Sequence, residues 1–212
     1  MKRNTIIILA LFVGLIAPVL GLSQNKKNED RIQLAREKYT EGLALITENE
    51  EEGVPGYTKI VREQMWAAIG PRVDTMRFYY YELRKDEREP YPDGYALRFA
   101  RRQYNVSVCR HLEEYLYDDK GKPLFYFSRF EEFLDEEDCG FHLNVNPESG
   151  LPEFEVRFYY DEKGKVIRSI YKMLDENGKM KEMNASQAKI IKNSSYETAF
   201  TYMKKIFDAI YQ

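Results

Sequence analysis

The sequence predicts an α+β fold: an antiparallel β-meander of about six strands, with N-terminal helices and a C-terminal helix packed on one face. The first observation is that apolar residues recur at helical spacing near both ends of the chain and at a spacing of two between them. The second is the abundance of aromatic residues, 17 Tyr and 12 Phe among 212 residues, because aromatic side chains favour pleated, half-buried surfaces.

Residues 1–23 are typical of a secretory signal peptide. A cationic start at Lys2 and Arg3 is followed by an apolar stretch, and then by Pro18 and small residues. An uncleaved anchor is the alternative, since this segment approaches the roughly 20 residues that span a bilayer. The sequence therefore predicts an exported protein, periplasmic or secreted, in which residues 24–212 form a single α+β domain with no membrane span after cleavage.

Three helices are expected. The first is capped by Asp30 and has one narrow apolar stripe that runs to Ile46. A second covers about Tyr57–Ile69 and stops at a Gly-Pro pair. The third closes the chain, with apolar residues at helical spacing between Tyr196 and Ile210.

Strands are expected between these helices, where the periodicity changes to two. The segments are Met76–Arg84, Tyr95–Val108, Leu112–Tyr117, Leu124–Phe130, Phe154–Tyr160 and Val166–Met173. The alternation is cleanest in Phe154–Tyr160, where Phe154 and Val156 share one face and Glu155 and Arg157 share the other.

Three turns have a common pattern, in which Asp is followed by two polar residues and Gly-Lys. They begin at Asp118, Asp161 and Asp175. The Asp side chain accepts hydrogen bonds from backbone amides inside such a turn, and the Gly adopts the positive φ that reverses the chain. The first two turns predict β-hairpins. The third has only a weak second strand at Lys181–Met183, so it either forms a hairpin or ends the sheet.

Both cysteines and both histidines lie close together in the sequence, at Cys109, His111, Cys139 and His142. In an exported protein a single cysteine pair predicts a disulfide, here between Cys109 and Cys139. Closing a loop of about 30 residues would stabilise the fold by roughly 3–4 kcal/mol. A zinc site made by all four side chains is the alternative, because residues two apart on a strand share a face. Two unrelated thiols are the third possibility.

Composition and motifs argue against several classes of function. Without Lys2 and Arg3 the chain has 30 basic and 35 acidic residues, so binding to nucleic acid is disfavoured. The sequence has no Gly-x-Ser-x-Gly elbow and no Gly-rich phosphate loop, and no cofactor is expected. The acidic run between Glu131 and Asp138 could supply paired carboxylates for glycan hydrolysis, but such a run is more typical of a solvated loop.

The exposed face of the predicted sheet is the candidate binding site. Tyrosine and arginine dominate binding hot spots because they combine contact area with hydrogen-bond donors. The candidate residues are Tyr79, Tyr81, Arg98, Arg157, Tyr159, Arg168 and Tyr171. The alternative is that the tyrosines cover the edges of the core and the arginines are cross-strand partners. The leading hypothesis is an exported, non-enzymatic module that binds a protein or a glycan; a small exported glycan hydrolase is the alternative.

The Tyr-Asp-x-x-Gly-Lys hairpins at Asp118 and Asp161, after a signal peptide and a helix, resemble those of small exported proteins of Bacteroidetes-type bacteria. The turn pattern is also similar to that of the tyrosine-aspartate and MORN-variant β-hairpin repeats of bacterial surface proteins. The resemblance covers about residues 112–180. It implies no catalytic residues.

Overall fold

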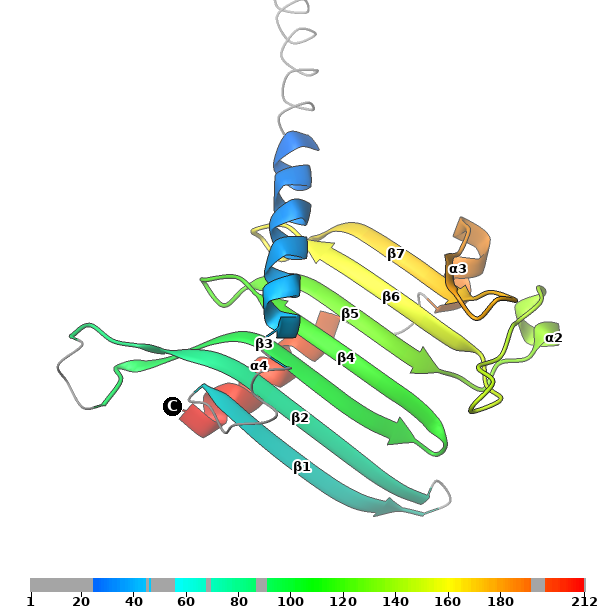
Figure 1. Cartoon of the computed structure of the whole chain (residues 1–212), viewed down its shortest axis with the longest axis horizontal. Coiled ribbons are helices and arrows are strands. Elements are labelled where there is room, and N and C mark those ends of the chain that lie inside the picture. Colours follow the sequence, from blue (N-terminus) through cyan, green and yellow to red (C-terminus); the bar gives the residue numbers. More distant parts are fainter. Residues whose placement is uncertain are drawn as a thin grey trace, which may run out of the picture.

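The computed structural model describes residues 25–44, 46, 56–67, 70–86, 91–191 and 197–211. The expected signal peptide, residues 1–23, lies outside these ranges. In the described part, eight strands form one antiparallel sheet in which each strand pairs with the next along the chain, from β1 to β8 (Figure 1). This is a simple meander, and the α+β class is confirmed. No helix within the described ranges is long and apolar enough to cross a membrane.

The strands are β1 (Tyr57–Trp66), β2 (Gly70–Leu83), β3 (Gly94–Val106), β4 (Cys109–Tyr117), β5 (Pro123–Glu131), β6 (Glu153–Tyr160), β7 (Val166–Leu174) and β8 (Met180–Glu182). The helices are an N-terminal helix over residues 25–44, the single turn α2 (Glu136–Cys139), α3 (Ala185–Ile191) and α4 (Glu197–Tyr211). All six predicted strands are present. The expected number of about six was too low, because β1 and β8 extend the sheet at its two edges.

The prediction of a helix over Tyr57–Ile69 was wrong, because this segment forms β1. Its residues pair in register with β2, from Tyr57 opposite Tyr79 to Trp66 opposite Gly70. The apolar residues of β1 fit a helical stripe as well as a strand, and several are β-branched or aromatic, which favours the strand. The pairing with β2 decides between the two, and this is a tertiary contact that local periodicity does not report.

The three Asp-x-x-Gly-Lys turns have the same geometry. In each turn the Asp backbone N–H donates to the Lys carbonyl at 2.8 Å, and the Gly adopts a φ between 70° and 80°. The Asp side chain accepts two further backbone N–H bonds at 2.8–3.0 Å. The third turn therefore forms a hairpin, β7–β8, as the first two form β4–β5 and β6–β7.

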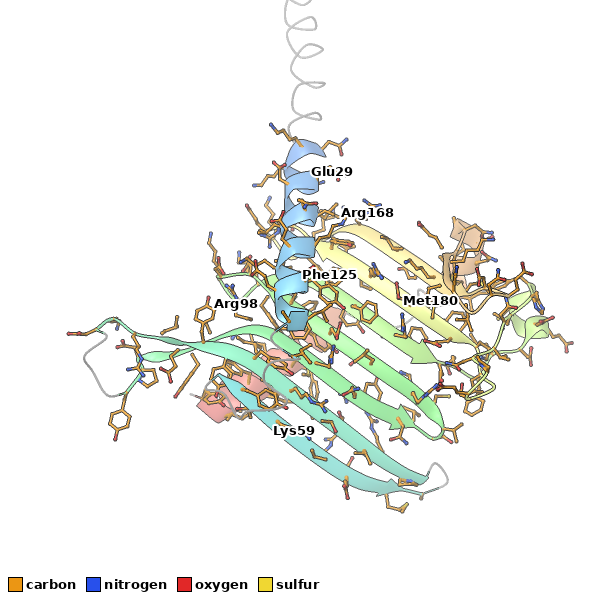
Figure 2. All side chains as sticks on the ribbon, in the orientation of Figure 1. Glu29, Lys59, Arg98, Phe125, Arg168 and Met180 are labelled. Carbon is orange, nitrogen blue, oxygen red and sulfur yellow. The ribbon has the colours of Figure 1, made fainter. Side chains whose placement is uncertain are left out.

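The helices pack on opposite faces of the sheet, and not on one face as expected. In Figure 1 the N-terminal helix crosses in front of the sheet and α4 lies behind it. The front core joins Ile32 and Ala35 to Phe125 and other strand residues, and Phe125 lies by the helix in Figure 2. The rear core joins Phe200 and Met203 of α4 to the other face. We call these the front face and the rear face.

The central strands need two covers because they are apolar on both faces. In β5, Phe125 and Phe127 belong to the front core, whereas Tyr126 and Phe130 belong to the rear core. A strand that is buried on both sides is stable only when a layer packs on each side. A single helical layer would have left one of the two aromatic rows exposed to water.

The N-terminal helix is attached by polar contacts as well as by its apolar stripe. Arg31 donates to the carboxylate of Asp118 and to the carbonyl of Tyr160, both at 2.9 Å. Farther along the helix, Tyr39 donates to the buried carboxylate of Glu114. These contacts fix the helix over one half of the front face.

Candidate functional site

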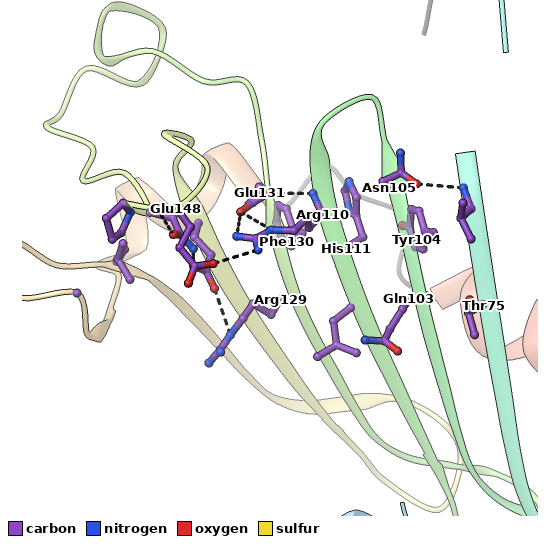
Figure 3. Close-up of a pocket in the computed structure, with 17 residues that line it drawn as sticks. Thr75, Gln103, Tyr104, Asn105, Arg110, His111, Arg129, Phe130, Glu131 and Glu148 are labelled. Atoms are coloured by element: carbon purple, nitrogen blue, oxygen red, sulfur yellow. Dashed lines mark hydrogen bonds and ion pairs between the residues drawn. The ribbon is translucent and has the colours of Figure 1, made fainter. Parts of the chain in front are cut away.

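A hollow of about 770 Å³ lies at one end of the sheet, and we call it the sheet hollow (Figure 3). Strands β2 to β7 contribute to its lining, together with the loop before β6 and the turn after β7. The lining residues on the strands include Thr75, Gln103, Arg110, Leu112, Arg129 and Glu153. Its volume falls within the roughly 300–1,000 Å³ that is usual for ligand sites.

The sheet hollow opens on the front face. Leu112 packs against the front core, and side chains two residues apart along a strand share a face, so Arg110 belongs to the same face. The intervening His111 points to the rear, where its ring stacks between those of Tyr104 and Phe130 at centroid distances of 4.7 and 6.0 Å. Tyr104, His111 and Phe130 are nevertheless among the residues that line the hollow.

Arg110 is oriented by a buried carboxylate. Its side chain donates to Glu131 Oε1 at 2.6 and 3.0 Å, while its backbone N–H donates to Glu131 Oε2 at 3.0 Å. Glu148 accepts a further bond at 3.3 Å. The side chain of Glu131 is 3% exposed, whereas that of Arg110 is 55% exposed. Glu131 thus holds one side of the guanidinium group in place, and the other side is open to solvent.

Arg129, on the neighbouring strand, has a similar arrangement. It lies 3.4 Å from Glu153 and 3.2 Å from Glu155, and 47% of its side chain is exposed. Glu155 is 1% exposed and also contacts Arg157 at 2.8 Å and Lys172 at 3.4 Å. A single buried carboxylate therefore organises three cationic side chains.

The wall of the sheet hollow is a loop closed by its own hydrogen bonds. Asn146 N–H donates to the carbonyl of Leu151, and Gly150 N–H donates to the carbonyl of Asn146, both at 2.8 Å. The Asn146 amide also donates to Glu153 at 2.7 Å, which connects the loop to β6. Such internal bonding makes the wall part of the site before any ligand arrives.

The electrostatics of the sheet hollow are nearly balanced. Two arginines face three carboxylates, those of Glu131, Glu148 and Glu153. Burial by itself would raise the pKa of Glu131, but hydrogen bonds from Arg110 lower it below its usual range. Burial, with nearby arginine charges, lowers the pKa of His111 to about 4, so this histidine is neutral at pH 7. The hollow therefore offers oriented donors and acceptors without a strong net charge.

A buried ionic network lies on the rear face below the hollow. Asp74 is fully buried and accepts two bonds from Arg102, at 2.6 and 2.9 Å. Arg62 and Arg72 lie 3.3 and 3.7 Å from the same carboxylate. Burial alone would lower the pKa of Arg102, but the hydrogen bonds and charge of Asp74 raise it, so Arg102 remains charged.

The residues predicted to form a binding face do not lie on one surface. Tyr79 and Tyr159 belong to the front core, and Tyr171 belongs to the rear core. All three are at most 9% exposed. For these tyrosines the structure supports the alternative interpretation, in which they cover the core and do not form a binding face.

The remaining predicted residues are more accessible but separated. Arg98 lies over the ring of Tyr81 at 5.0 Å and contacts Asp119 at the end of the sheet far from the hollow. Arg157 is bound to Glu155, and Arg168 is exposed on β7. Figure 2 shows Arg98 and Arg168 on different parts of the sheet.

The two cysteines and two histidines do not form a common site. Cys109 is buried at the start of β4, Cys139 is half-buried in α2, and the predicted disulfide between them is absent from the structure. His142 contacts Glu136, whereas His111 lies between two aromatic rings. The described residues include no group of three or more His, Cys, Asp or Glu side chains that could hold a metal, so the alternative zinc site is not formed there.

The residues of the acidic run differ in burial. Glu131 closes β5 and is buried against Arg110, whereas Glu132 and Asp135 are exposed. The expectation of a uniformly solvated loop was therefore wrong for its first member. Arg110 and Arg129 were missed as site residues because each is one of several polar residues on its strand and belongs to no recognisable motif. Their alternation with core residues was the only signal in the sequence.

Comparisons with protein-family models, with curated proteins and with solved structures found no match to this chain.

Proposed function

We propose that this protein is an exported, non-enzymatic binding module that holds an uncharged, polar segment of a partner protein in the sheet hollow. The observation that carries this proposal is the pair of arginines, Arg110 and Arg129, which are oriented by buried carboxylates and still about half exposed. Orientation before binding reduces the entropy that a ligand must offset, and arginine is enriched at binding hot spots.

The balance of charges that line the hollow supports an uncharged ligand. A strongly anionic ligand would meet three carboxylates, and a strongly cationic one would meet two guanidinium groups. Peptide N–H and C=O groups match such a mixed lining. A glycan is less favoured, since sugar rings usually stack on aromatic faces and the rings at the hollow, those of Tyr104, His111 and Phe130, already stack on one another.

The alternative of a glycan hydrolase is less well supported by the carboxylates at the hollow. Such an enzyme needs one carboxylic acid whose pKa is raised, so that it stays protonated until it donates to the leaving group. The hydrogen bonds from Arg110 instead lower the pKa of Glu131. The buried carboxylate is thus suited to orienting an arginine and poorly suited to giving up a proton.

A phage-displayed random peptide library, selected on the purified protein, tests the proposal. Selected peptides should bind the Arg129→Gln variant at least about tenfold more weakly. Glu155 remains paired with Arg157 and Lys172 in this variant, so the fold should persist. Gln103→Trp should block the hollow, while Arg168→Trp, an exposed strand position elsewhere, should bind as the unchanged protein does.

Failure to enrich any peptide, or equal binding by all variants, would overturn the proposal. A glycan array probed with the same proteins provides the second arm. Glycan binding that is lost in Gln103→Trp and retained in Arg168→Trp would replace the protein ligand with a glycan. Hydrolysis of the bound glycan would favour the enzymatic alternative.

A further inference from the structure

Strand β1 is a long edge of the sheet. Within the described part of the chain it pairs only with β2, and it forms one border of the sheet in Figure 1. Two of its apolar side chains are well exposed, Val61 at 50% and Met65 at 76%. The opposite edge, β8, has only three residues. An exposed edge of this length is a template for pairing with another strand.

The hydrogen bonds to β2 show which residues of β1 face outward. In an antiparallel pair, successive residues alternately direct their N–H and C=O groups to the neighbour and away from it. Tyr80 N–H donates to the carbonyl of Gly56 at 2.8 Å, so Gly56 and every second residue after it face β2. The backbone groups of Lys59, Val61 and Glu63 therefore point to the open edge.

A second copy of β1 complements these outward residues in antiparallel orientation. With the two-fold axis at Val61, this residue lies opposite Val61 of the second copy. Lys59 then lies opposite Glu63 of the second copy, and Met65 lies opposite Tyr57 of the second copy. In this register an apolar Val61 pair lies at the centre. Two identical Lys59–Glu63 ion pairs flank it, and two Met65–Tyr57 apolar pairs lie outside them. Each kind of cross-strand pair is stabilising.

The charges within one chain favour the same register. Lys59 lies directly opposite Arg77 on β2, and like charges that face each other across strands are destabilising. Glu63 of a second copy would bring a carboxylate beside this pair. Figure 2 shows Lys59 on the border strand, where a second copy could approach.

We propose that two copies of this chain associate through β1 in this register, so that two eight-stranded sheets join into one continuous sheet. The occupant of the edge is a second copy, because the pattern of charge and apolar residues along β1 is complementary to itself. This association does not depend on the sheet hollow or on its ligand.

Sedimentation velocity of the purified protein over a range of concentrations tests the proposal. A monomer–dimer equilibrium is expected. Lys59→Glu and Glu63→Lys should each weaken the dimer about tenfold, because two attractive pairs become repulsive. The double variant K59E/E63K should restore the dimer. Lys181→Glu, on the other edge strand, is the matched control and should have no effect.

Val61→Pro removes an outward N–H at the two-fold axis and no bond to β2, so it should abolish the dimer while the far-ultraviolet circular dichroism spectrum is retained. A protein that stays monomeric at every concentration would overturn the proposal. A dimer that is insensitive to Val61→Pro and to both single charge reversals would overturn it too. Failure of the double variant to regain dimerisation would refute this register.

Discussion

Asp74→Asn should be among the most destabilising single substitutions that leave the shape of the core unchanged. Asp74 is fully buried, it accepts two bonds from Arg102, and two further arginines lie within 3.7 Å. Removing its charge leaves Arg102 with the more distant carboxylate of Glu113, at 3.6 Å, as compensation for a largely buried positive charge. Breaking a buried ion pair in this way costs about 3–5 kcal/mol.

Urea unfolding followed by circular dichroism gives the free energy of unfolding directly. For a domain of this size, a loss of 3–5 kcal/mol corresponds to a Tm lower by roughly 6–20 °C. Asp119→Asn is the matched control, because Asp119 also pairs with an arginine but has a side chain that is 76% exposed. This control should lose about 1 kcal/mol or less. Equal losses for the two variants would refute the argument that burial makes the Asp74 network important.

Three further predictions concern the helix, the stacked histidine and a turn. Arg31→Ala should cost about 1.5–3 kcal/mol, since it removes charged hydrogen bonds that attach the N-terminal helix, whereas Lys27→Ala, at an exposed pair, should cost under about 1 kcal/mol in the same urea assay. Because the pKa of His111 is lowered to about 4, the unfolded chain binds an extra proton between about pH 6.5 and 4, so stability should fall as the pH falls through this window. His111→Gln should remove that component, and an identical pH dependence in both proteins would contradict the assignment. Gly164→Ala places an L side chain at a φ of 80° and should cost about 1–2 kcal/mol, while Gly94→Ala, at a negative φ, should cost less; thermal melts that rank them in the opposite order would refute the argument.

The amino-acid sequence by itself predicts the features that are local. The Asp-x-x-Gly-Lys turns form as expected because their hydrogen bonds close within a few residues, and six strands follow from a period of two. The N-terminal and C-terminal helices follow from their apolar stripes. In each case the determining contacts lie within one turn or along one strand.

The tertiary structure decides what depends on contacts between distant segments. Pairing with β2 makes a strand of β1, and aromatic rows on both sides of β5 place helices on both faces. The same packing buries Tyr79 and Tyr159, which strand alternation had placed on an open face. It also gathers Arg110 and Arg129 into one hollow. The physical reason is that a side chain's exposure depends on what covers its strand, and local periodicity reports only which residues share a face.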